Sequence, residues 1–477
     1  NIITFASSIV LARLLVPVDF GLVALATGLG AVVSALTALP IGEALIRTQE
    51  VEDDHFDSAF TLGLIRAVAL TVMLLIAAWP SAIIYDDMRL LPIMLVLALN
   101  ALASGFYSAR WPMIQKSLRF GPDFVVGTTS QIVSAVSSIL IAYFFRSYWA
   151  IVVPLALLQF LSVAITHFYA PYRFRPSFTR IPEILSFSVW MTLGATLNAL
   201  NTRIDTLLIG GILGQRAVGY YSYGDGKATM PTRELSAPLL YVLFPGLATV
   251  QHDPARLASA YKRVLAVIFA ICAPAGVGLA LISDQFVHSL LGDKWLPIVP
   301  IMQVIAVVLA CETLVVPVAP LSMATGDTRG LFMRNIAIFF TRAPFIVVGL
   351  FLWGIEGVLA ARIFAMICYL LIYMAFARKL SGVSVRDQLG GCSRSFAALG
   401  IMAISTMAFK AALPPSFLLQ FGALLATVLV GALSYTIGHA ALWYIAGRPQ
   451  GAEAELLALA RGAIKRKPTP PAAMQPE

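Results

Sequence analysis

The stretch that decides the fold runs from Asn198 to Leu235 and reads NALNTRIDTLLIGGILGQRAVGYYSYGDGKATMPTREL. Its apolar content predicts two helices, at residues 186–213 and 219–247, joined by a short turn that begins at Gly214. Both helices contain ionisable side chains, which are Arg203, Asp205, Asp225, Lys227, Arg233 and Glu234. A charge at the centre of a bilayer costs ~2.5–3.5 kcal/mol on an insertion scale. We therefore expect these side chains to face a polar cavity or one another, and not lipid.

Helical spacing divides the polar residues of this stretch into separate stripes. Asn201 and Asp205 share one stripe of the first helix, whereas Arg203 lies on another. Tyr223 and Lys227 share a face of the second helix. One interpretation is a polar seam that packs the two helices together. The other, which we favour, is the wall of a transport cavity.

The composition of the whole chain places it in a membrane. Of its 477 residues, 59% are hydrophobic and only 12% are charged, and the mean hydropathy is +0.85. A soluble core does not need so much apolar sequence, which indicates a polytopic membrane protein. The 4 cysteines and 5 histidines show no metal-ligand spacing. We expect no metal site, no cofactor and no nucleic-acid partner.

Apolar segments long enough to cross a bilayer recur along the chain. With residues 1–12 taken as a clipped first helix, they predict about 14 transmembrane helices. Lys and Arg gather in alternate loops, so the positive-inside rule places both termini in the cytoplasm. The further spans are 19–46, 59–84, 90–114, 122–145, 148–170, 263–284, 297–321, 331–353, 356–377, 394–413 and 417–446.

A weak internal repeat relates two parts of the chain. Residues Arg13–Gly21 align with Gly211–Gly219, 198 positions later. The repeat predicts an all-α fold with a six-helix lobe at 1–180, a second at 181–380, two more helices at 381–447 and a cytoplasmic tail at 448–477. Because an even number of helices separates the copies, the lobes should be related by a pseudo-two-fold axis along the membrane normal. Arg203 aligns with Phe5 and Lys227 with Leu29, so the fold itself does not require charge there.

Two prolines are candidates for helix kinks that move during transport, and one further arginine is a candidate for the cavity wall. Pro231 removes the helical bond to the Lys227 carbonyl, and Pro40 is placed to act similarly in the first lobe. Both are candidate kinks that bend during transport. Arg342 lies near the middle of its predicted span and is followed by Pro344, so its charge cannot easily reach an interface.

Several short motifs, taken together in their order and spacing, resemble a known family. They are Val10–Arg13 with Asp19–Gly21, Ile41–Arg47, Gln115–Phe120, Asn201 with Asp205–Gly210, Gly214 with Val218–Tyr221, Leu243–Ala248 and Leu291–Trp295. Together they resemble the polysaccharide-transporter family of the multidrug/oligosaccharidyl-lipid/polysaccharide exporter superfamily, which includes the O-antigen, colanic-acid and exopolysaccharide flippases. The resemblance covers nearly the whole chain.

The resemblance implies a flippase of the bacterial inner membrane. Its cargo would be an oligosaccharide on a polyprenyl pyrophosphate carrier, moved by alternating access, with membrane lipids, a polymerase and a chain-length regulator as partners. A cationic cavity suits a pyrophosphate or acidic sugars. The cavity residues that we predict are Arg203, Lys227, Arg233, Arg342, Asp205, Asn201 and Tyr223.

Two other functions remain open from the sequence. A cation-coupled drug antiporter of the same superfamily would use an acidic, aromatic cavity. A membrane-embedded polymerase or transferase would normally carry a large polar loop with catalytic side chains, and no predicted external loop is long enough for that. We therefore predict that the protein is not an enzyme.

Overall fold

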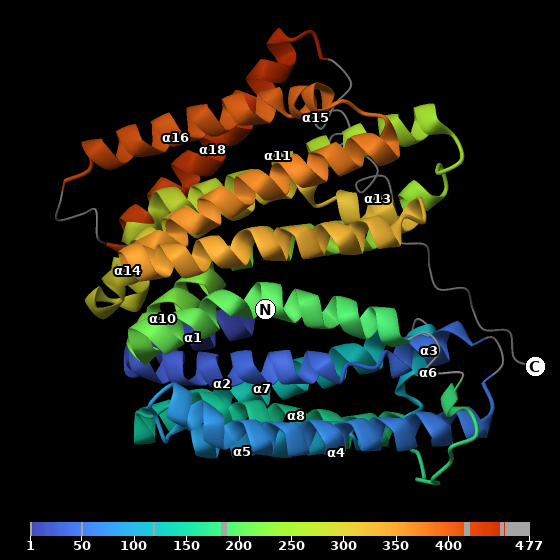
Figure 1. The fold of residues 1–477 in the computed structure, drawn as a ribbon. Helices are drawn as coiled ribbons and strands as arrows, with labels where there is room; N and C mark the ends of the chain where they lie inside the picture. The colour runs from blue at the N-terminus through green and yellow to red at the C-terminus, as the bar shows by residue number, and fades with distance from the viewer. Residues whose placement is uncertain are drawn as a thin grey trace, which may run out of the picture. The chain divides into compact units, whose positions relative to one another are not determined.

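The structure, a computed structural model, describes residues 2–48, 51–117, 120–182, 188–414, 420–448 and 453. Within these ranges all regular secondary structure is helical (Figure 1). The described residues include 9 helices that are long and apolar enough to cross a membrane. The predicted all-α multi-pass membrane fold is therefore confirmed, whereas the count of 14 helices and the two-lobe symmetry stay predictions. Most of the predicted tail at 448–477, and residues 118 and 119 of the Gln115–Phe120 motif, lie outside the described residues.

The chain forms two compact units. The first unit consists of Asn1–Gly224, Leu290–Ile298 and Asn335–Ala361, and the second of Asp225–Ser289, Val299–Arg334 and Arg362–Glu477. These units are defined by packing, and the division into lobes at residue 180 stays a prediction.

The first unit is built from antiparallel helical hairpins. α4 packs along α5, α7 packs along α8, and α1 packs against α7. The helices are α1 (Ile2–Leu14), α2 (Pro17–Leu36), α3 (Ile41–Arg47), α4 (Asp53–Ile84), α5 (Leu90–Ser104), α6 (Trp111–Lys116), α7 (Phe120–Phe145), α8 (Trp149–Tyr169) and the first part of α10 (Ser188–Ala248).

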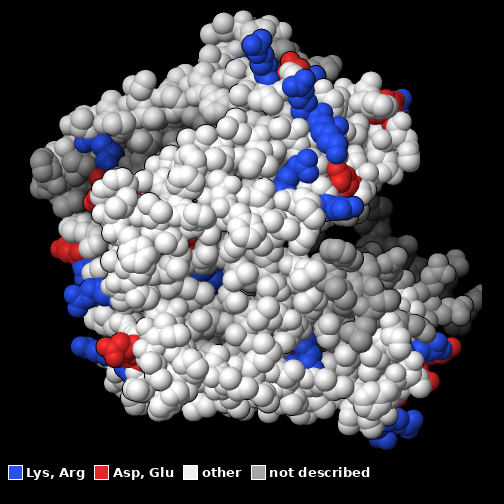
Figure 2. All heavy atoms as spheres, viewed as in Figure 1, with Lys and Arg blue, Asp and Glu red and all other residues white. Residues whose placement is uncertain are grey.

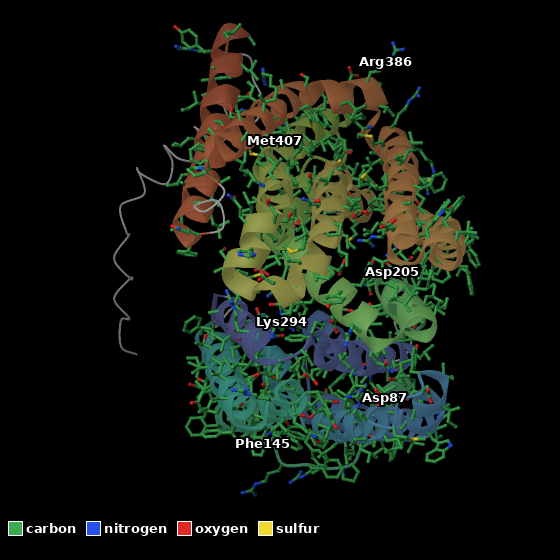
Figure 3. All side chains as sticks on the ribbon, turned by 90° about the vertical axis from the view of Figure 1, so that its left-hand side faces the viewer. Asp87, Phe145, Asp205, Lys294, Arg386 and Met407 are labelled. Atoms are coloured by element: carbon green, nitrogen blue, oxygen red, sulfur yellow. The ribbon has the colours of Figure 1, made fainter. Side chains whose placement is uncertain are left out.

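The outer surface of the first unit has the polarity of a lipid-facing surface. On the face shown in Figure 2, charged side chains gather towards the two ends of its helices, and the surface between those ends is almost free of charge. Large apolar side chains of this unit are exposed, such as Ile76 on α4 at 68%, and at the end of α7 Phe145 points away from the helices with 72% of its surface accessible (Figure 3). In water such exposure would be unfavourable, whereas lipid tails solvate it.

Two predicted spans prove to be broken. The span 19–46 divides into α2 and α3, and the span 90–114 divides into α5 and α6. Pro40 is the residue before α3, with φ −79° and ψ 59°, so it lies in a break between helices and does not kink one. The prediction of Pro40 as a helix kink is therefore wrong, because a proline that lacks an N–H here starts a new helix. Pro231, in contrast, lies inside the continuous second part of α10.

The turn predicted at Gly214 is present as a sharp break within α10. Gly214 has φ 79° and ψ 178°, a backbone conformation that favours glycine. α10 therefore consists of two helical arms, a first arm before Gly214 and a second arm after it. α14 (Thr328–Ser381) turns in the same way at Trp353 and Gly354, where Gly354 has φ 59°.

Two glycines allow α2 and the second arm of α10 to touch through their backbones. A Cβ atom added to Gly21 would lie 1.8 Å from the carbonyl oxygen of Gln215. A Cβ atom added to Gly219 would lie 1.8 Å from the carbonyl oxygen of Pro17. Small residues permit such close helix crossings in membranes. The two contacts are equivalent under the sequence repeat, which aligns Pro17 with Gln215 and Gly21 with Gly219.

A short 3-10 helix (Asp293–Ile298) closes the end of α1. Trp295 is fully buried and donates from Nε1 to the carbonyl of Ala12 at 2.8 Å. Lys294 donates from Nζ to the carbonyl of Leu15 at 2.7 Å, and Arg13 donates from Nε to the carbonyl of Leu290 at 2.7 Å. These side chains satisfy backbone carbonyls that the helix end leaves unpaired.

The second unit is packed around α11. α11 contacts α12, α15, α16 and α18, and α16 packs along α18. Lys410 pairs with Asp284 at 2.7 Å, and the Tyr435 hydroxyl donates to the carbonyl of Ala270 at 2.8 Å. Besides the later parts of α10 and α14, its helices are α11 (Pro254–Phe286), α12 (Val299–Glu312), α13 (Val318–Ala324), α15 (Val385–Gly391), α16 (Ser393–Ala412) and α18 (Phe421–Ile445).

Candidate functional site

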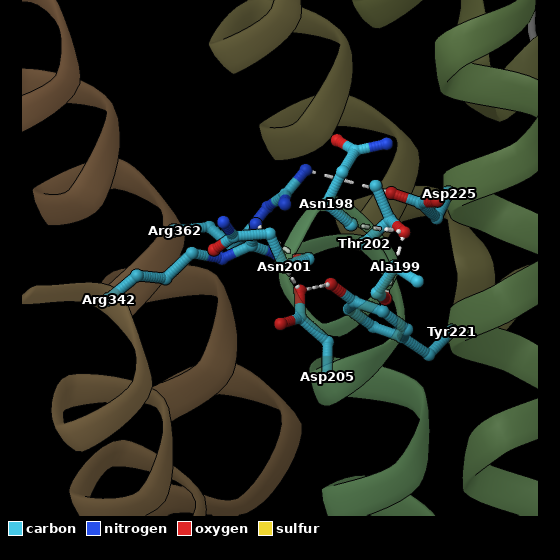
Figure 4. A network of polar contacts seen from close by, with 9 residues as sticks. All are labelled: Asn198, Ala199, Asn201, Thr202, Asp205, Tyr221, Asp225, Arg342 and Arg362. Atoms are coloured by element: carbon cyan, nitrogen blue, oxygen red, sulfur yellow. Dashed lines mark hydrogen bonds and ion pairs between the residues drawn. The ribbon is translucent and has the colours of Figure 1, made fainter. Parts of the chain in front are cut away.

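A buried ion pair lies at the centre of the charged stretch. Asp205, on the first arm of α10, accepts a hydrogen bond on Oδ2 from Arg342 Nη2 at 2.5 Å (Figure 4). Arg342 comes from the part of α14 that belongs to the same unit. The two side chains are only 4% and 14% exposed, so this pair is largely removed from solvent.

Two further hydrogen bonds hold this pair in place. Arg342 Nη1 donates to the carbonyl oxygen of Asn201 at 2.9 Å, one helical turn before Asp205. The hydroxyl of Tyr221, on the second arm of α10, donates to Asp205 Oδ2 at 2.6 Å. The Asp205 carboxylate therefore ties the first arm of α10 to α14 and to the second arm, and the two terminal nitrogens of Arg342 bond two different acceptors on the first arm.

The cluster also contains polar atoms that the protein leaves unsatisfied. Asn201 Oδ1 and Arg342 Nε are buried and have no hydrogen-bond partner within the described part of the chain. Buried polar groups are nearly always hydrogen-bonded, to protein, water or ligand. One acceptor and one donor are thus available here to a polar molecule.

Arg203 lies on the same arm but points elsewhere. Two positions along an α-helix differ by about 200° in direction, so Arg203 and Asp205 occupy nearly opposite faces. Arg203 is exposed, and no ion pair to it is found among the described residues. Asp205 is bonded to Arg342 and Tyr221 instead. The positive charge of Arg203 is therefore available to a ligand.

The second unit holds the other predicted charges. Arg362 lies 3.7 Å from Asp225, with side chains 12% and 38% exposed (Figure 4). Arg233 is 67% exposed and contacts the neighbouring Glu234 at 3.3 Å. Lys227 is half-buried. The roles of Lys227 and Arg233 as cavity residues stay predictions.

Tyr223 takes a different place from the one that we expected. It is 8% exposed, and its ring lies 4.5 Å from that of Trp295 and 5.0 Å from that of Phe20. Its hydroxyl donates to the carbonyl of Ser8 at 3.0 Å. The face that it shares with Lys227 along the helix is covered here by α1 and α2. This geometry is that of a packing residue, and we leave Tyr223 out of the proposed site.

Sequence reasoning missed the hydrogen-bond partners of the acidic residues. Tyr221 was not selected, although a tyrosine hydroxyl buried in a membrane helix needs an acceptor. The sequence predicts Arg342 as a cavity residue only because it lies near the middle of its span. Its pairing with Asp205 joins positions 137 apart in the chain, and only the opposite signs of two mid-helix charges could have suggested it.

The comparison with known families covers the first arm of α10 and most of the first unit. Residues 10–300 match the model of a family described as "Polysaccharide biosynthesis protein", which is more than half of the chain. The chain belongs to this family. The resemblance drawn from the sequence motifs is thereby confirmed.

Proteins that resemble this chain come from several bacteria. The lipopolysaccharide biosynthesis protein WzxC of Escherichia coli (strain K12) is 24% identical over 385 residues, which is 80% of this chain and 78% of that protein. The teichuronic acid biosynthesis protein TuaB of Bacillus subtilis (strain 168) is 24% identical, with 62% of this chain and 64% of that protein covered. The succinoglycan biosynthesis transport protein ExoT of Rhizobium meliloti (strain 1021) is 24% identical, with 63% and 62% covered.

Two solved transporter structures share the fold of this family member. The lipid II flippase MurJ, in an inward closed conformation, superposes with a TM-score of 0.69 at 14% identity, over 94% of this chain and 99% of that one. A multidrug-resistance MATE transporter in an inward-facing conformation gives a TM-score of 0.54 at 17% identity, over 80% and 96%. At these identities the likeness concerns the fold alone.

The candidate residues fall mostly inside the family match. The matched range 10–300 includes both arms of α10, whereas Arg342 lies beyond it. Within this polysaccharide biosynthesis protein, the positions inside the range are Asn201, Arg203, Asp205, Tyr221, Lys227 and Arg233.

Proposed function

We propose that this protein translocates an oligosaccharide linked to polyprenyl pyrophosphate across the bacterial inner membrane, by alternating access, for lipopolysaccharide or exopolysaccharide biosynthesis. The observation that carries the proposal is an exposed Arg203 on the first arm of α10 of a polysaccharide biosynthesis protein, with no ion pair among the described residues. In the span that the sequence predicts at 186–213, a permanent cation is costly unless it meets an anion during the working cycle.

The relatives support this cargo. WzxC and TuaB are named for lipopolysaccharide and teichuronic acid biosynthesis, and ExoT is named as a transport protein for succinoglycan biosynthesis. MurJ, whose fold the chain shares, is named as a lipid II flippase. A transport role without a covalent step agrees with the exposed cation of Arg203 and with a sequence that predicts no catalytic loop.

Arg203 and the Asp205–Arg342 cluster, on opposite faces of the first arm of α10, have distinct roles in the proposal. Arg203 binds the pyrophosphate through two parallel N–H donors, a geometry that lysine cannot reproduce. Asp205 holds Arg342 in position, and Tyr221 donates a hydrogen bond to Asp205. Asn201 Oδ1 and Arg342 Nε offer an acceptor and a donor to sugar hydroxyl groups.

The finer features of the transporter belong to the same proposal. The chain would cross the membrane 14 times, as two six-helix lobes and two further helices, with both termini in the cytoplasm. It would work beside a polymerase and a chain-length regulator and catalyse no reaction of its own.

A drug antiporter is the second candidate because the fold also resembles a MATE transporter and Asp205 is a buried acid. Such an antiporter would need a carboxylate that exchanges its cation or proton. Asp205 is instead bonded at 2.5 Å to Arg342, whose guanidinium takes the place of such a cation. This pairing favours the flippase.

The test uses cells that lack the native gene and express the wild type or one of two arginine variants. Arg203→Ala should abolish surface polysaccharide and lead to accumulation of lipid-linked oligosaccharide in the inner membrane. Arg216→Ala removes the same charge from an exposed position on the same helix and should leave both quantities unchanged. Normal polysaccharide in cells without any copy of the protein, or a change in drug resistance alone, would contradict the proposal.

A further inference from the structure

A cavity with mostly apolar walls and one charged side chain lies in the first unit, and neither Asp205 nor Arg342 lines it. It has a volume of about 310 Å³ and lies where two helical breaks meet, between α2 and α3 and between α5 and α6. This volume is at the lower end of the ~300–1,000 Å³ typical of ligand pockets. It suits a small polar group better than a whole lipid-linked sugar. The side chains that shape it include Phe60, Arg66, Tyr107, Trp111 and Gln115.

Arg66 is the charged group of this cavity. It lies about 20 Å along α4 from Asp53, at 1.5 Å per residue. Its Nε donates to the carbonyl of Thr37, at the end of α2, at 2.7 Å. Its terminal nitrogens have no hydrogen-bond or ion-pair partner among the described residues. One side of the guanidinium is therefore used by the protein, and the other side is left to the cavity.

The positive charge of Arg66 is not neutralised by the described residues that line the cavity. Among the described residues, no aspartate or glutamate lines the cavity. The Tyr107 hydroxyl and the Gln115 amide add neutral donors, and neither has a hydrogen bond to the described part of the chain. A cation with neutral donors around it and no carboxylate is complementary to an anion, and guanidinium pairs best with phosphate or carboxylate oxygens.

The surroundings indicate where that anion comes from. Next to Arg66 on α4, Ile65 and Val68 are 49% and 46% exposed, and Phe106 beside Tyr107 is 47% exposed. Ile65 and Val68 lie on α4, a helix of membrane length, where lipid chains would cover them, and Phe106 lies in the turn after α5. A molecule with a charged phosphate and an apolar tail matches both the cation in the cavity and the apolar side chains beside it.

We propose that this cavity, the Arg66 pocket, binds the phosphate headgroup of an anionic membrane lipid. The occupant holds the two helical breaks of the first unit together through Arg66, Tyr107 and Gln115. The inference goes beyond the proposed function, since the pocket is separate from the Asp205 cluster and the occupant is not the cargo. If Arg66 served only to cap the end of α2, its Nε would be sufficient, because Nε alone donates to the carbonyl of Thr37.

Three variants of the full-length protein separate these roles. Arg66→Gln removes the charge. Gly63→Leu fills the cavity but keeps Arg66, because a Cβ atom at Gly63 meets nothing closer than 3.9 Å. Arg110→Gln is the matched control, because it removes an exposed arginine near the same break that does not line the pocket.

The experiment measures the thermal unfolding of the purified protein in detergent, titrated with dioleoyl phosphatidylglycerol. Dioleoylglycerol, which lacks the phosphate, and inorganic pyrophosphate, which lacks the chains, are titrated in parallel. Phosphatidylglycerol should raise the unfolding temperature of the wild type saturably, as ligands of the folded state do. Arg66→Gln and Gly63→Leu should each weaken its apparent affinity about tenfold or more, the effect expected for a lost charged hydrogen bond. Arg110→Gln should match the wild type.

Several results would overturn the proposal. Equal affinity for phosphatidylglycerol in the wild type and in Gly63→Leu would show that the lipid binds elsewhere, even if Arg66→Gln failed to fold. Equal stabilisation by dioleoylglycerol would show that the phosphate is not recognised, and stabilisation by pyrophosphate alone would show a soluble ligand. Because no cargo is present, failure here leaves the proposed flippase function untouched.

Discussion

Removing the carboxylate of Asp205 should destabilise the first unit strongly. In Asp205→Asn, the Arg342 guanidinium stays buried but loses the anion that lies 2.5 Å away. The two side chains are 4% and 14% exposed, so solvent cannot replace the lost partner. Breaking such a pair from one side costs ~3–5 kcal/mol. The weaker hydrogen bond from Tyr221 adds to this on the order of 1 kcal/mol.

The assay is the free energy of unfolding of the purified protein in detergent micelles, measured by denaturant titration. The double variant Asp205→Asn with Arg342→Gln removes both charges, so its cost should be well below the sum of the two single costs. The matched control is Asp53→Asn, which breaks the pair with Arg110, in which the side chains are 47% and 83% exposed. Exposed pairs are worth ~0–1 kcal/mol, so this variant should barely differ from the wild type.

The reasoning would be refuted if Asp205→Asn unfolded within ~1 kcal/mol of the wild type, as an exposed pair would. Additive effects of the two single changes would refute it as well, because residues in direct contact should couple. Either result would mean that Arg342 and Asp205 are solvated independently, for example by water in an open cavity.

The remaining predictions concern transport, packing and topology. Arg203→Lys should restore surface polysaccharide only in part relative to Arg203→Ala, at unchanged protein abundance, because an ammonium lacks the two-point geometry of guanidinium; full restoration would mean that any positive charge suffices. Gly21→Ala and Gly219→Ala should each lower membrane abundance, since the new Cβ would lie 1.8 Å from a backbone oxygen, whereas Gly226→Ala, with open space around it, should not. Equal abundance of the three would contradict the close crossing. Reporter fusions at Lys262 and at Arg146 should report opposite sides of the membrane, and the same side for both would rule out the predicted topology.

Local features of the chain determined the membrane fold and the two arms of α10. Apolar content over a window of about 20 residues depends only on neighbouring positions, so a spanning helix is visible in sequence. The break at Gly214 was visible for a similar reason, since glycine adopts its φ of 79° without strain. The breaks before α3 and α6 were not visible, because a proline in an apolar run can either kink a helix or start another.

From the sequence, the candidate site is known only as a set of ionisable residues, without the directions or contacts of their side chains. Arg203, Asp205 and Arg342 stood out because ionised groups are costly in apolar helices. Their directions depend on which neighbouring helices pack against each face, and the sequence does not contain that information locally. Tyr223 illustrates this, because it shares a helical face with Lys227 and yet lies against Phe20 and Trp295.

The sequence by itself determined that the chain is an all-helical membrane protein with charges where lipid cannot solvate them, and its motifs resembled the correct family. Only the tertiary structure decided that Asp205 is bonded to Arg342 and Tyr221, that Arg203 has no such partner among the described residues, and that Gly21 meets the second arm of α10. The physical reason is the range of the forces involved. Hydropathy and backbone preference act between neighbours in the chain, whereas an ion pair such as Asp205–Arg342 forms between positions 137 apart that only the packing of helices brings together.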